Sequence, residues 1–393
     1  MEKPKISIVV SHPIQHFCPM YALLSQSAEW DIRVFFASSF GSVNTYDPKY
    51  RRQVSWKNLQ LEKFQHEFLN TKQPAPITMW LDAVDLDTRL NAFNPSVVIV
   101  YGYSIKLSRH TIKWASSHHK PLIMISDAEL RTRRNVITNV IKKIFIPRLF
   151  RQVSAYLTVG DANEEYYHYY GADPYLFFRS PLPINLEAYQ TAWETRGILR
   201  SEFRASFGIP DNQIVVSMVG KLDSSKRQVD IIKAINHSMF HDHSINLVIV
   251  GSGETERELK KIAAKSRQYI TFPGFLEPEQ LPSVYAATDI YVHSSALDRH
   301  PLAISEAIYM GCPVVASNAL ASIGPTDDIQ YGRNALIYPV RNTDRLANCL
   351  NRLISNPELM KIFGRESHEI AIKAQKLANG QGLRAALIAM GYL

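Results

Sequence analysis

The sequence predicts an α/β protein of two doubly wound, Rossmann-like parallel-sheet domains that face each other across a cleft. A chain of 393 residues is too long for a single typical core, which favours two domains. Short β-branched runs alternate with helical patterns in both halves, as expected when helices cover both faces of a parallel sheet. A polar stretch with two prolines at 180–200 interrupts the alternation, so we place the first domain at 1–190 and the second at 191–379.

Short, nearly continuous apolar runs define the expected strands. In the first half they are 6–10, 32–36, 97–101, 122–125 and 155–159. In the second half they are 214–219, 245–250, 270–272, 290–293, 314–316 and 336–338. Because parallel strands end at one edge of the sheet, the loops that follow them are where a ligand site is expected.

Composition describes a globular protein of a reducing compartment. Apolar residues make up 46% and charged residues 20% of the chain, unlike a disordered protein. Three cysteines without CxxC spacing argue against a disulfide framework and against a zinc site. The apolar run after Lys5 is too short for a signal peptide, and no run approaches the length of a membrane-spanning helix. We therefore expect a cytoplasmic protein without a bound metal.

The net charge is +8, and part of it is concentrated in residues 131–152. This segment carries Lys and Arg, no acid, and interleaved Ile, Val, Phe and Leu. Such a basic amphipathic segment can lie on an anionic membrane surface, and Pro147 would kink or end a helix there. The alternative is an ordinary solvated surface, and no recognised motif supports a nucleic-acid partner. We hypothesise peripheral membrane contact through 131–152.

A glycine and two lysines follow the first expected strand of the second domain. Gly220 permits a tight exit from that strand, and Lys221 and Lys226 lie between it and the next helix. Two cations beside a helix N-terminus suit a diphosphate and would stabilise negative charge on a leaving group. A lone Gly-Lys pair is more often part of a solvated loop, but this one stands at the carboxyl edge of a sheet.

A second glycine cluster begins at Gly251, directly after strand 245–250. Its match to a dinucleotide fingerprint is weak, because Glu256 replaces the third glycine and the cluster does not follow the domain's first strand. Direct phosphate contact by Gly251 and a tight turn that lines the site both remain open. Phe275, in the next loop, either borders a nucleobase or is a buried turn residue.

Two acids, Asp298 and Glu306, follow strand 290–293, with Pro301 between them. Because proline is accepted at the first position of a helix and disfavoured inside it, Asp298 is expected on a loop and Glu306 about one turn into the helix. Carboxylates in such a crevice commonly accept hydrogen bonds from ribose or sugar hydroxyls. The simpler alternatives are a loop cap for Asp298 and a helix-dipole charge for Glu306.

Together these motifs resemble the nucleotide-binding domain of the GT-B glycosyltransferases, specifically the retaining glycosyltransferase family 4. The family's glycine-basic pair with a downstream lysine is matched by Gly220-Lys221 and Lys226. Its pattern of a glutamate, seven residues and a glutamate reads Asp298-x7-Glu306 here, so the first acid is one methylene shorter. Further matches to the family pattern are 311–317 and 332–335.

The resemblance covers about residues 210–370 and implies a role for each matched position. Lys221 and Lys226 would hold the donor diphosphate, Glu306 would bind the nucleotide ribose, and Asp298 would address the donor sugar. The backbone beside Asp298 that would contribute is that of His300, Pro301, Leu302 and Ala303. The family retains anomeric configuration, generally without a metal, and its chains commonly return a C-terminal helix, here 380–393, to the first domain. Residues 191–379 would then bind the nucleotide sugar and 1–190 the acceptor.

The first domain offers fewer signals. His12, Gln15 and His16 follow its first strand, where they would contact acceptor or donor phosphate; the alternative is a structural role. Asp127, after strand 122–125, either orients an acceptor hydroxyl or caps the following helix.

The sequence thus predicts a hexosyl transferase that uses a nucleotide-diphosphate sugar, with UDP favoured over GDP, and no separate cofactor. Its acceptor would be a glycan or glycolipid in the synthesis of cell-surface polysaccharide or a related glycoconjugate. Two alternatives share the fold: a non-catalytic nucleotide-sugar-binding subunit of a glycan-assembly complex, and a sugar-nucleotide epimerase.

Overall fold

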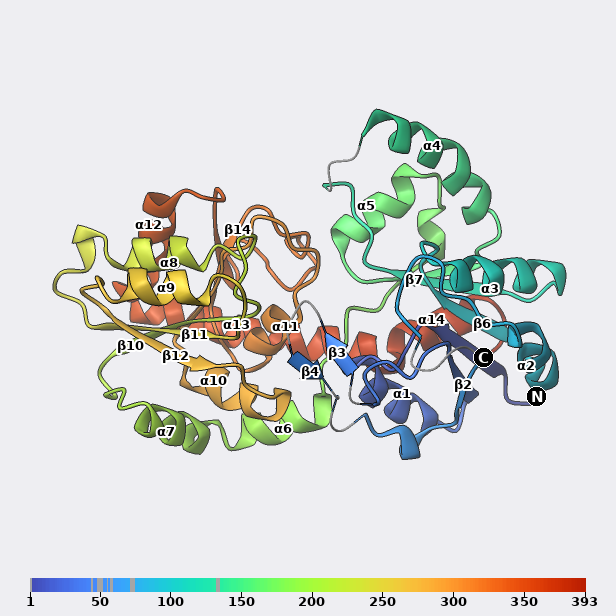
Figure 1. Cartoon of the computed structure of the whole chain (residues 1–393), viewed down its shortest axis with the longest axis horizontal. Coiled ribbons are helices and arrows are strands. Elements are labelled where there is room, and N and C mark those ends of the chain that lie inside the picture. Colours follow the sequence, from blue (N-terminus) through green and yellow to red (C-terminus); the bar gives the residue numbers. More distant parts are fainter. Residues whose placement is uncertain are drawn as a thin grey trace. The chain divides into compact units, whose positions relative to one another are not determined.

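The computed structural model describes residues 2–43, 45–47, 52–54, 56, 59–70, 75–131 and 135–393. The chain divides into two compact units, which are residues up to Asn185 with Gln375–Leu393 (unit 1) and Leu186–Ala374 (unit 2). The boundaries expected from the sequence, 190 and 379, lie a few residues later. Each unit is built on one parallel sheet with helices on both faces (Figure 1). This confirms the predicted fold class.

Unit 1 contains a seven-stranded parallel sheet in the order β5-β2-β1-β6-β7-β8-β9. Its strands are β1 Lys5–Val10, β2 Asp31–Phe36, β5 His66–Phe68, β6 Val97–Tyr101, β7 Leu122–Ser126, β8 Ala155–Thr158 and β9 Phe177–Arg179. Its helices are α1 Phe17–Ser25, α2 Leu86–Phe93, α3 Lys106–Ser117, α4 Val136–Phe150, α5 Asp161–Tyr169 and α14 Gly382–Ala389. A separate antiparallel pair is formed by β3 Thr45–Asp47 and β4 Arg52–Val54.

Both faces of this sheet are buried, which explains why its strands are almost continuously apolar. Ile8 of β1 packs into the core beneath α1 and α14, while the next residue, Val9, points into the opposite core beneath α2–α5. On α14, Leu383 and Leu387 are buried in the first of these cores. The C-terminal helix is therefore part of unit 1.

Unit 2 contains a six-stranded parallel sheet in the order β12-β11-β10-β13-β14-β15. Its strands are β10 Ile214–Val219, β11 Ile245–Val250, β12 Tyr269–Gly274, β13 Ile290–His293, β14 Val314–Ser317 and β15 Ala335–Tyr338. Its helices are α6 Leu186–Glu194, α7 Arg196–Ser206, α8 Gln228–Ile235, α9 Glu256–Ala263, α10 Leu281–Ala287, α11 Leu302–Tyr309, α12 Thr343–Ile354 and α13 Pro357–Lys376, the last of which ends in unit 1. Helices α8, α9 and α12 cover one face, and α6, α7 and α10 lie on the other (Figure 1). The strand order reverses between β10 and β13, which makes this the topological switch point of the sheet.

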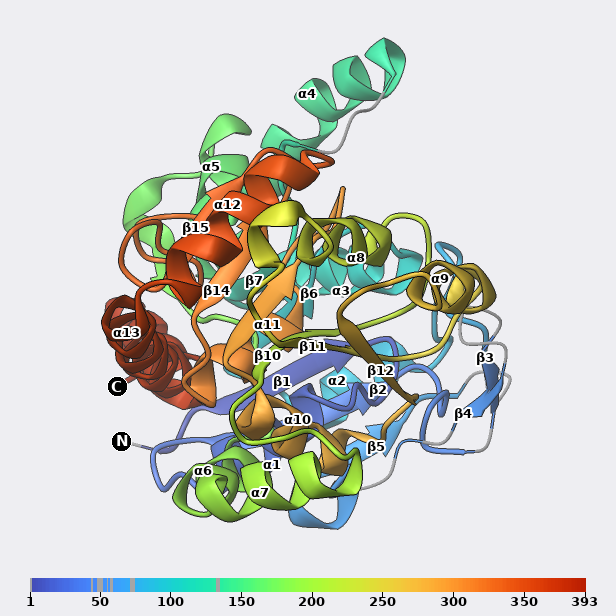
Figure 2. The ribbon, with the colours of Figure 1, turned by 90° about the vertical axis from the view of Figure 1, so that its left-hand side faces the viewer.

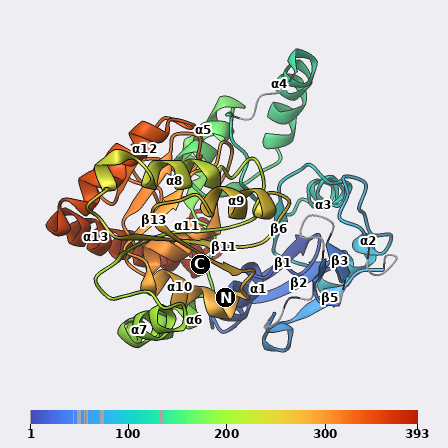
Figure 3. The ribbon, with the colours of Figure 1, turned by 60° about the vertical axis from the view of Figure 1, so that its left-hand side comes forward.

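Helix α4 exposes an apolar face and extends away from the sheet of its unit (Figures 2 and 3). Six of its apolar side chains are between 45% and 77% exposed, and their spacing forms two adjacent rows along the helix: Val136, Ile137, Val140, Ile141, Ile144 and Phe145. Its last turn is anchored in the core of unit 1 by Ile146, Leu149 and Phe150. The helix continues through Pro147 and ends at Phe150. Residues 132–134 of the basic segment lie outside the described ranges.

Two glycines allow the loops after β10 and β11 to approach closely. A Cβ atom on Gly251, whose φ is +135°, would lie 1.9 Å from the carbonyl oxygen of Gly220. A Cβ atom on Gly253 would lie 2.3 Å from the carbonyl oxygen of Leu222. Because both obstacles are backbone atoms, no rotamer change can relieve them.

We therefore expect Gly253→Ala to destabilise the protein by about 1–3 kcal/mol, the usual cost of overpacking. Denaturant unfolding measures this change. Gly197→Ala in α7 is the matched control, because a Cβ atom there meets nothing within 4 Å and alanine favours the helix. Equal stability of the two variants would contradict the close approach.

Candidate functional site

The switch point brings the loop after β10 and the loop after β13 into direct contact. Ser294 Oγ donates to the Lys226 carbonyl oxygen at 2.8 Å. The Ala296 amide donates to the Ser225 carbonyl oxygen at 2.7 Å. These bonds join the two loops into one structure at the carboxyl edge of the sheet.

The loop after β10 is shaped by its own side chains. Asp223 Oδ1 accepts hydrogen bonds from the amides of Ser225 at 2.9 Å and Lys226 at 3.2 Å, a local turn that aspartate forms readily. Gln228 Nε2 donates to the Lys221 carbonyl oxygen at 2.7 Å. Both lysines are therefore presented from an ordered loop. Gly220, with φ of +155°, supplies the exit from β10.

The carboxylate of Asp298 contacts side chains from both loops and from the end of β13. Lys226 Nζ forms an ion pair with its Oδ2 atom. His293 Nε2 lies 2.9 Å and Ser295 Oγ 3.3 Å from the same oxygen. Tyr291 is hydrogen bonded to the other side of the imidazole, with 3.2 Å between its hydroxyl and Nδ1. The structure thus brings Lys226 and Asp298 together, as their predicted places at one sheet edge require.

Burial acts on both the carboxyl group of Asp298 and the imidazole of His293. It tends to raise the pKa of Asp298, but the hydrogen bonds and charges of His293 and Lys226 outweigh it and hold that pKa well below its usual range. Burial also lowers the pKa of His293, against the opposing effect of Asp298. At neutral pH the cluster therefore contains an ionised carboxylate and a neutral imidazole.

Glu306 lies in a different environment, in the middle of the short helix α11. Its Oε2 atom accepts a hydrogen bond from the Tyr285 hydroxyl at 2.8 Å. Burial raises the pKa of Glu306 to about 7, against the opposing effects of the Tyr285 and Tyr189 hydroxyls. No hydrogen bond or ion pair joins Glu306 to Lys226 or Asp298. The ring of Tyr285, which bonds Glu306, and the ring of Tyr291, which bonds His293, are 5.8 Å apart.

The remaining predicted donor-side residues border this region in different ways. Pro301 is the N-cap residue of α11, one position before the helix itself, and Leu302 and Ala303 form its first turn. His300 precedes the helix in the partly exposed loop. Gly251 packs against the β10 loop, which fits the tight-turn interpretation, and its contact with phosphate stays a prediction. Phe275 follows β12, two strands away from β10.

On unit 1, the predicted acceptor residues follow β1 and β7. The carboxyl end of β1 leads to His12, Gln15 and His16, and His12 Nδ1 is hydrogen bonded to Ser11 Oγ at 2.8 Å. Burial lowers the pKa of His12 to about 4, and burial with the charge of His12 lowers the pKa of His16 to about 4. Both imidazoles are therefore neutral at pH 7 and can accept a hydrogen bond from a ligand.

Asp127 does not cap the helix that follows it, so that alternative is wrong. Helix α4 begins at Val136, and its cap is Asn135, whose side chain accepts from the Thr138 amide at 2.7 Å. Eight residues lie between Asp127 and the first residue of α4, which is too many for Asp127 to cap that helix. Asp127 lies two strand positions from β1 in the sheet order, and its role toward an acceptor stays a prediction.

Sequence reasoning missed the partners of both acids. His293 and Ser295 contact Asp298, Tyr291 bonds His293 in turn, and Tyr285 bonds Glu306. His293 stands at the end of β13, five residues before Asp298, and a polar residue at the carboxyl end of a buried strand was the available signal. No sequence signal indicated Tyr285, because it reaches Glu306 from another helix.

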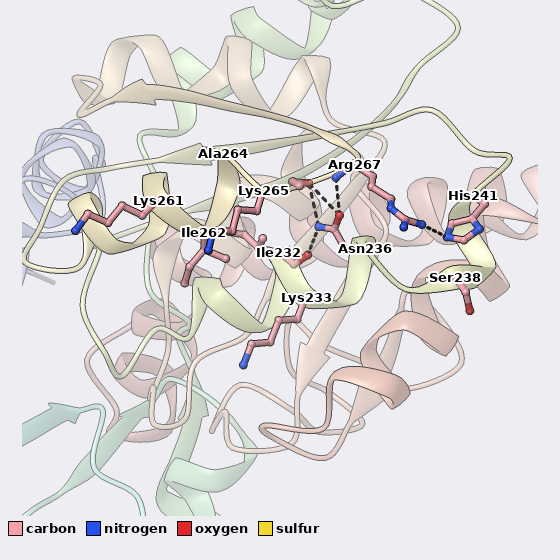
Figure 4. A pocket seen from close by; sticks show the side chains of 11 residues that line it. Ile232, Lys233, Asn236, Ser238, His241, Lys261, Ile262, Ala264, Lys265 and Arg267 are labelled. Carbon is pink, nitrogen blue, oxygen red and sulfur yellow. Dashed lines mark hydrogen bonds between the residues drawn. The ribbon is translucent and has the colours of Figure 1, made fainter.

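A basic groove of about 920 Å³ lies elsewhere on unit 2, between α8, α9 and the loops before β11 and β12. These loops enter the sheet at its amino edge, so the groove lies away from the switch point. Its cations do not converge: Lys233 and Lys261 point away from the cluster around Asn236, while Arg267 is directed to His241 (Figure 4). It therefore adds nothing to the candidate site.

In the part of the chain that the structure describes, no group of three or more His, Cys, Asp and Glu side chains is arranged to hold a metal ion. Within the same ranges, none of the helices combines the length and apolar character needed to traverse a bilayer.

Solved structures of similar architecture cover almost the whole chain. A glycosyltransferase from Rickettsia africae ESF-5 aligns with a TM-score of 0.74 at 14% identity, over 99% of both chains. Anabaena HepE in complex with UDP and glucose gives a TM-score of 0.66 at 15% identity, over 98% of this chain and 100% of that one. The likeness establishes the fold, which is the GT-B fold of two doubly wound domains.

Residues 200–369 match the family described as "Glycosyl transferases group 1". Spore coat protein SA of Bacillus subtilis is 28% identical over 200 residues, which are 48% of this chain and 52% of that protein. The GDP-mannose-dependent alpha-mannosyltransferase of Mycobacterium tuberculosis is 28% identical over 159 residues, 40% of this chain and 39% of that protein. The chain thus spans about half the length, or less, of these curated relatives.

The raised pKa of Glu306 predicts a pH-dependent stability. Because the folded-state pKa of about 7 exceeds the ordinary value of 4.5, the contribution of this group is fully present below pH 4.5 and is lost as the pH rises through 7. We expect Glu306→Gln, which cannot ionise, to gain on the order of 2–3 kcal/mol relative to the wild type across this window. Thermal melts between pH 4.5 and 7.5 measure it. The exposed Glu258→Gln is the control, and curves parallel to the wild type for both variants would contradict the assignment.

Proposed function

We propose that the protein transfers a hexose from a nucleoside-diphosphate sugar to a glycan or glycolipid acceptor, with retention of anomeric configuration. The observation that carries the proposal is the Lys226–Asp298 ion pair at the switch point of a glycosyl transferases group 1 domain. A cation suited to a diphosphate and a carboxylate suited to sugar hydroxyls lie side by side there. Relatives whose names include GDP-mannose, and the UDP-glucose complex of HepE, support this class of donor. UDP is our first choice and GDP the second.

The reaction needs a leaving diphosphate that is stabilised as its charge develops. In the proposed step, the acceptor hydroxyl oxygen bonds to the anomeric carbon while the bond from that carbon to the β-phosphate oxygen breaks. The diphosphate leaves with the bonding electron pair and accepts the acceptor proton on the same face of the sugar. Lys226 and Lys221 would neutralise the diphosphate, an electrostatic contribution that grows toward the transition state.

The two acids would contact neutral parts of the donor. Asp298 is ionised and can accept hydrogen bonds from sugar hydroxyls, while Glu306 would accept from the ribose. Gly251, Phe275 and the backbone of residues 300–303 would line the nucleotide. On unit 1, the neutral His12 and His16, with Gln15 and Asp127, would receive the acceptor.

Two other functions are compatible with the same fold and are separated by assay. A non-catalytic subunit would bind the nucleotide sugar without transfer or hydrolysis. An epimerase would isomerise the donor without any acceptor. Incubating the protein with UDP-glucose or GDP-mannose, with and without acceptor glycans, distinguishes all three outcomes by the products.

A glycolipid acceptor also explains the exposed face of α4, and we propose that this helix holds the protein at the cytoplasmic surface of an anionic membrane. Its six exposed apolar side chains would enter the interface. Basic residues flank them: Lys142 Nζ donates to the Tyr166 hydroxyl at 3.2 Å, and Lys143 lies 5.8 Å from the Tyr169 ring. Apolar insertion with adjacent positive charge suits a surface of anionic lipids.

For catalysis, we expect Lys226→Ala to lower kcat/KM by about 10²–10³-fold, comparable to the removal of one oxyanion-stabilising donor. Steady-state transfer assays measure the loss, and thermal melts show that the variant is folded. Lys233→Ala removes an exposed lysine from the adjacent helix α8 and should retain wild-type turnover. Near-wild-type turnover of Lys226→Ala would remove the central role that we assign to this residue.

For the membrane contact, we expect the triple variant Ile137→Ser, Ile141→Ser, Ile144→Ser to lose flotation with vesicles, because each buried isoleucine contributes about 1.5–3 kcal/mol. Changing Lys142, Lys143, Arg148 and Arg151 to Ala should abolish the preference for anionic vesicles. Ile198→Ser, which changes an equally exposed isoleucine of α7, is the control. Unchanged flotation of both α4 variants would exclude this surface.

A further inference from the structure

The carboxylate of Asp298 is held by only one of its two oxygens. Oδ2 receives the ammonium group of Lys226, the imidazole of His293 at 2.9 Å and the hydroxyl of Ser295 at 3.3 Å. Oδ1 accepts no hydrogen bond from the residues that the structure describes, and 18% of the side chain is exposed. One oxygen is therefore engaged by the protein, while the other is available to a ligand hydroxyl.

Among these donors, His293 is held on both ring nitrogens, with Ser295 Oγ also 3.0 Å from its Nε2 atom. Its side chain is 2% exposed, and the Tyr291 hydroxyl lies 3.2 Å from Nδ1, nearer than its alternative acceptor, the Val219 carbonyl oxygen at 3.4 Å. When Tyr291 donates to Nδ1, the hydrogen of the neutral ring resides on Nε2 and points to Asp298. Tyr291 and His293 are two positions apart on β13, so both side chains emerge on one face of the strand.

We infer that His293 is a positioning residue for sugar recognition, which holds Oδ2 of Asp298 so that Oδ1 faces a hydroxyl group of the donor hexose. This inference rests on the proposed function and deepens it. A neutral donor suits the task, because it orients the carboxylate without adding a second positive charge beside Lys226. The bare nucleoside diphosphate has no hexose hydroxyl to offer Oδ1. The positioning of Asp298 by His293 therefore affects the affinity for the nucleotide sugar and not the affinity for the diphosphate.

The test compares affinities for UDP-glucose and UDP, and for GDP-mannose and GDP, by titration calorimetry. We expect His293→Leu to weaken binding of the nucleotide sugar about tenfold, which corresponds to one hydrogen bond to a charged group. Binding of the bare diphosphate should stay within about twofold of the wild type. His293→Gln should restore most of the sugar affinity, because its amide N–H can donate from near the position of Nε2.

Two further variants separate positioning from a general structural role. Tyr291→Phe keeps the ring but removes the bond to Nδ1. It should weaken binding of the nucleotide sugar by a smaller factor than His293→Leu does. This variant tests the inference even if His293→Leu does not fold. In a double-mutant cycle, His293→Leu should add little to Asp298→Asn, because both act through one carboxylate.

Equal losses for the sugar and the bare diphosphate, or a fully additive cycle, would overturn the inference. Wild-type protein that binds neither the nucleotides nor their sugars would instead refute the proposed function, and the inference with it.

Discussion

The ion pair between Lys226 and Asp298 forms because β10 and β13 are neighbours in a sheet whose strand order reverses between them. The two strands are separated by 70 residues of chain, yet their carboxyl ends are adjacent. Crossovers leave this point in opposite directions, so the loops here are not covered by a connecting helix. The close packing of glycines 251 and 253 against the β10 loop, and the bonds between the two loops, follow from this topology.

Topology also gives the two acids of the site opposite electrostatic characters. Both are removed from water, which by itself raises the pKa of a carboxyl group. Asp298 has a lysine and an imidazole against it and stays ionised. Glu306 has only the hydroxyls of Tyr285 and Tyr189 acting against its burial, so its pKa rises to about 7. Pairs of carboxyl groups whose environments separate their pKa values are typical of sites that treat two parts of one ligand differently.

Much of the architecture could be predicted because buried parallel strands leave a strong sequence signal. The strands 97–101, 214–219, 245–250 and 290–293 have the bounds expected from the sequence, and the other predicted strands differ by one or two residues at an end. Strands β3, β4, β5 and β9 have three residues each and were not predicted. A run this short has too few alternating positions to reveal a period. The capping role considered for Asp127 was wrong for a related reason. The sequence near Asp127 does not indicate how long the following loop is, so the start of helix α4 at Val136 could not be predicted.

The sequence by itself determined the class of the fold, the division into two units and the loops in which Lys226, Asp298 and Glu306 lie. These features depend on local apolar runs, glycines and a proline, whose conformational preferences act within a few residues. Only the tertiary structure decided which oxygen of Asp298 is engaged, that Tyr291 and His293 stand behind it, and that Tyr285 faces Glu306. Such contacts join different strands, loops and helices, and their geometry depends on packing across the sheet that no local pattern records.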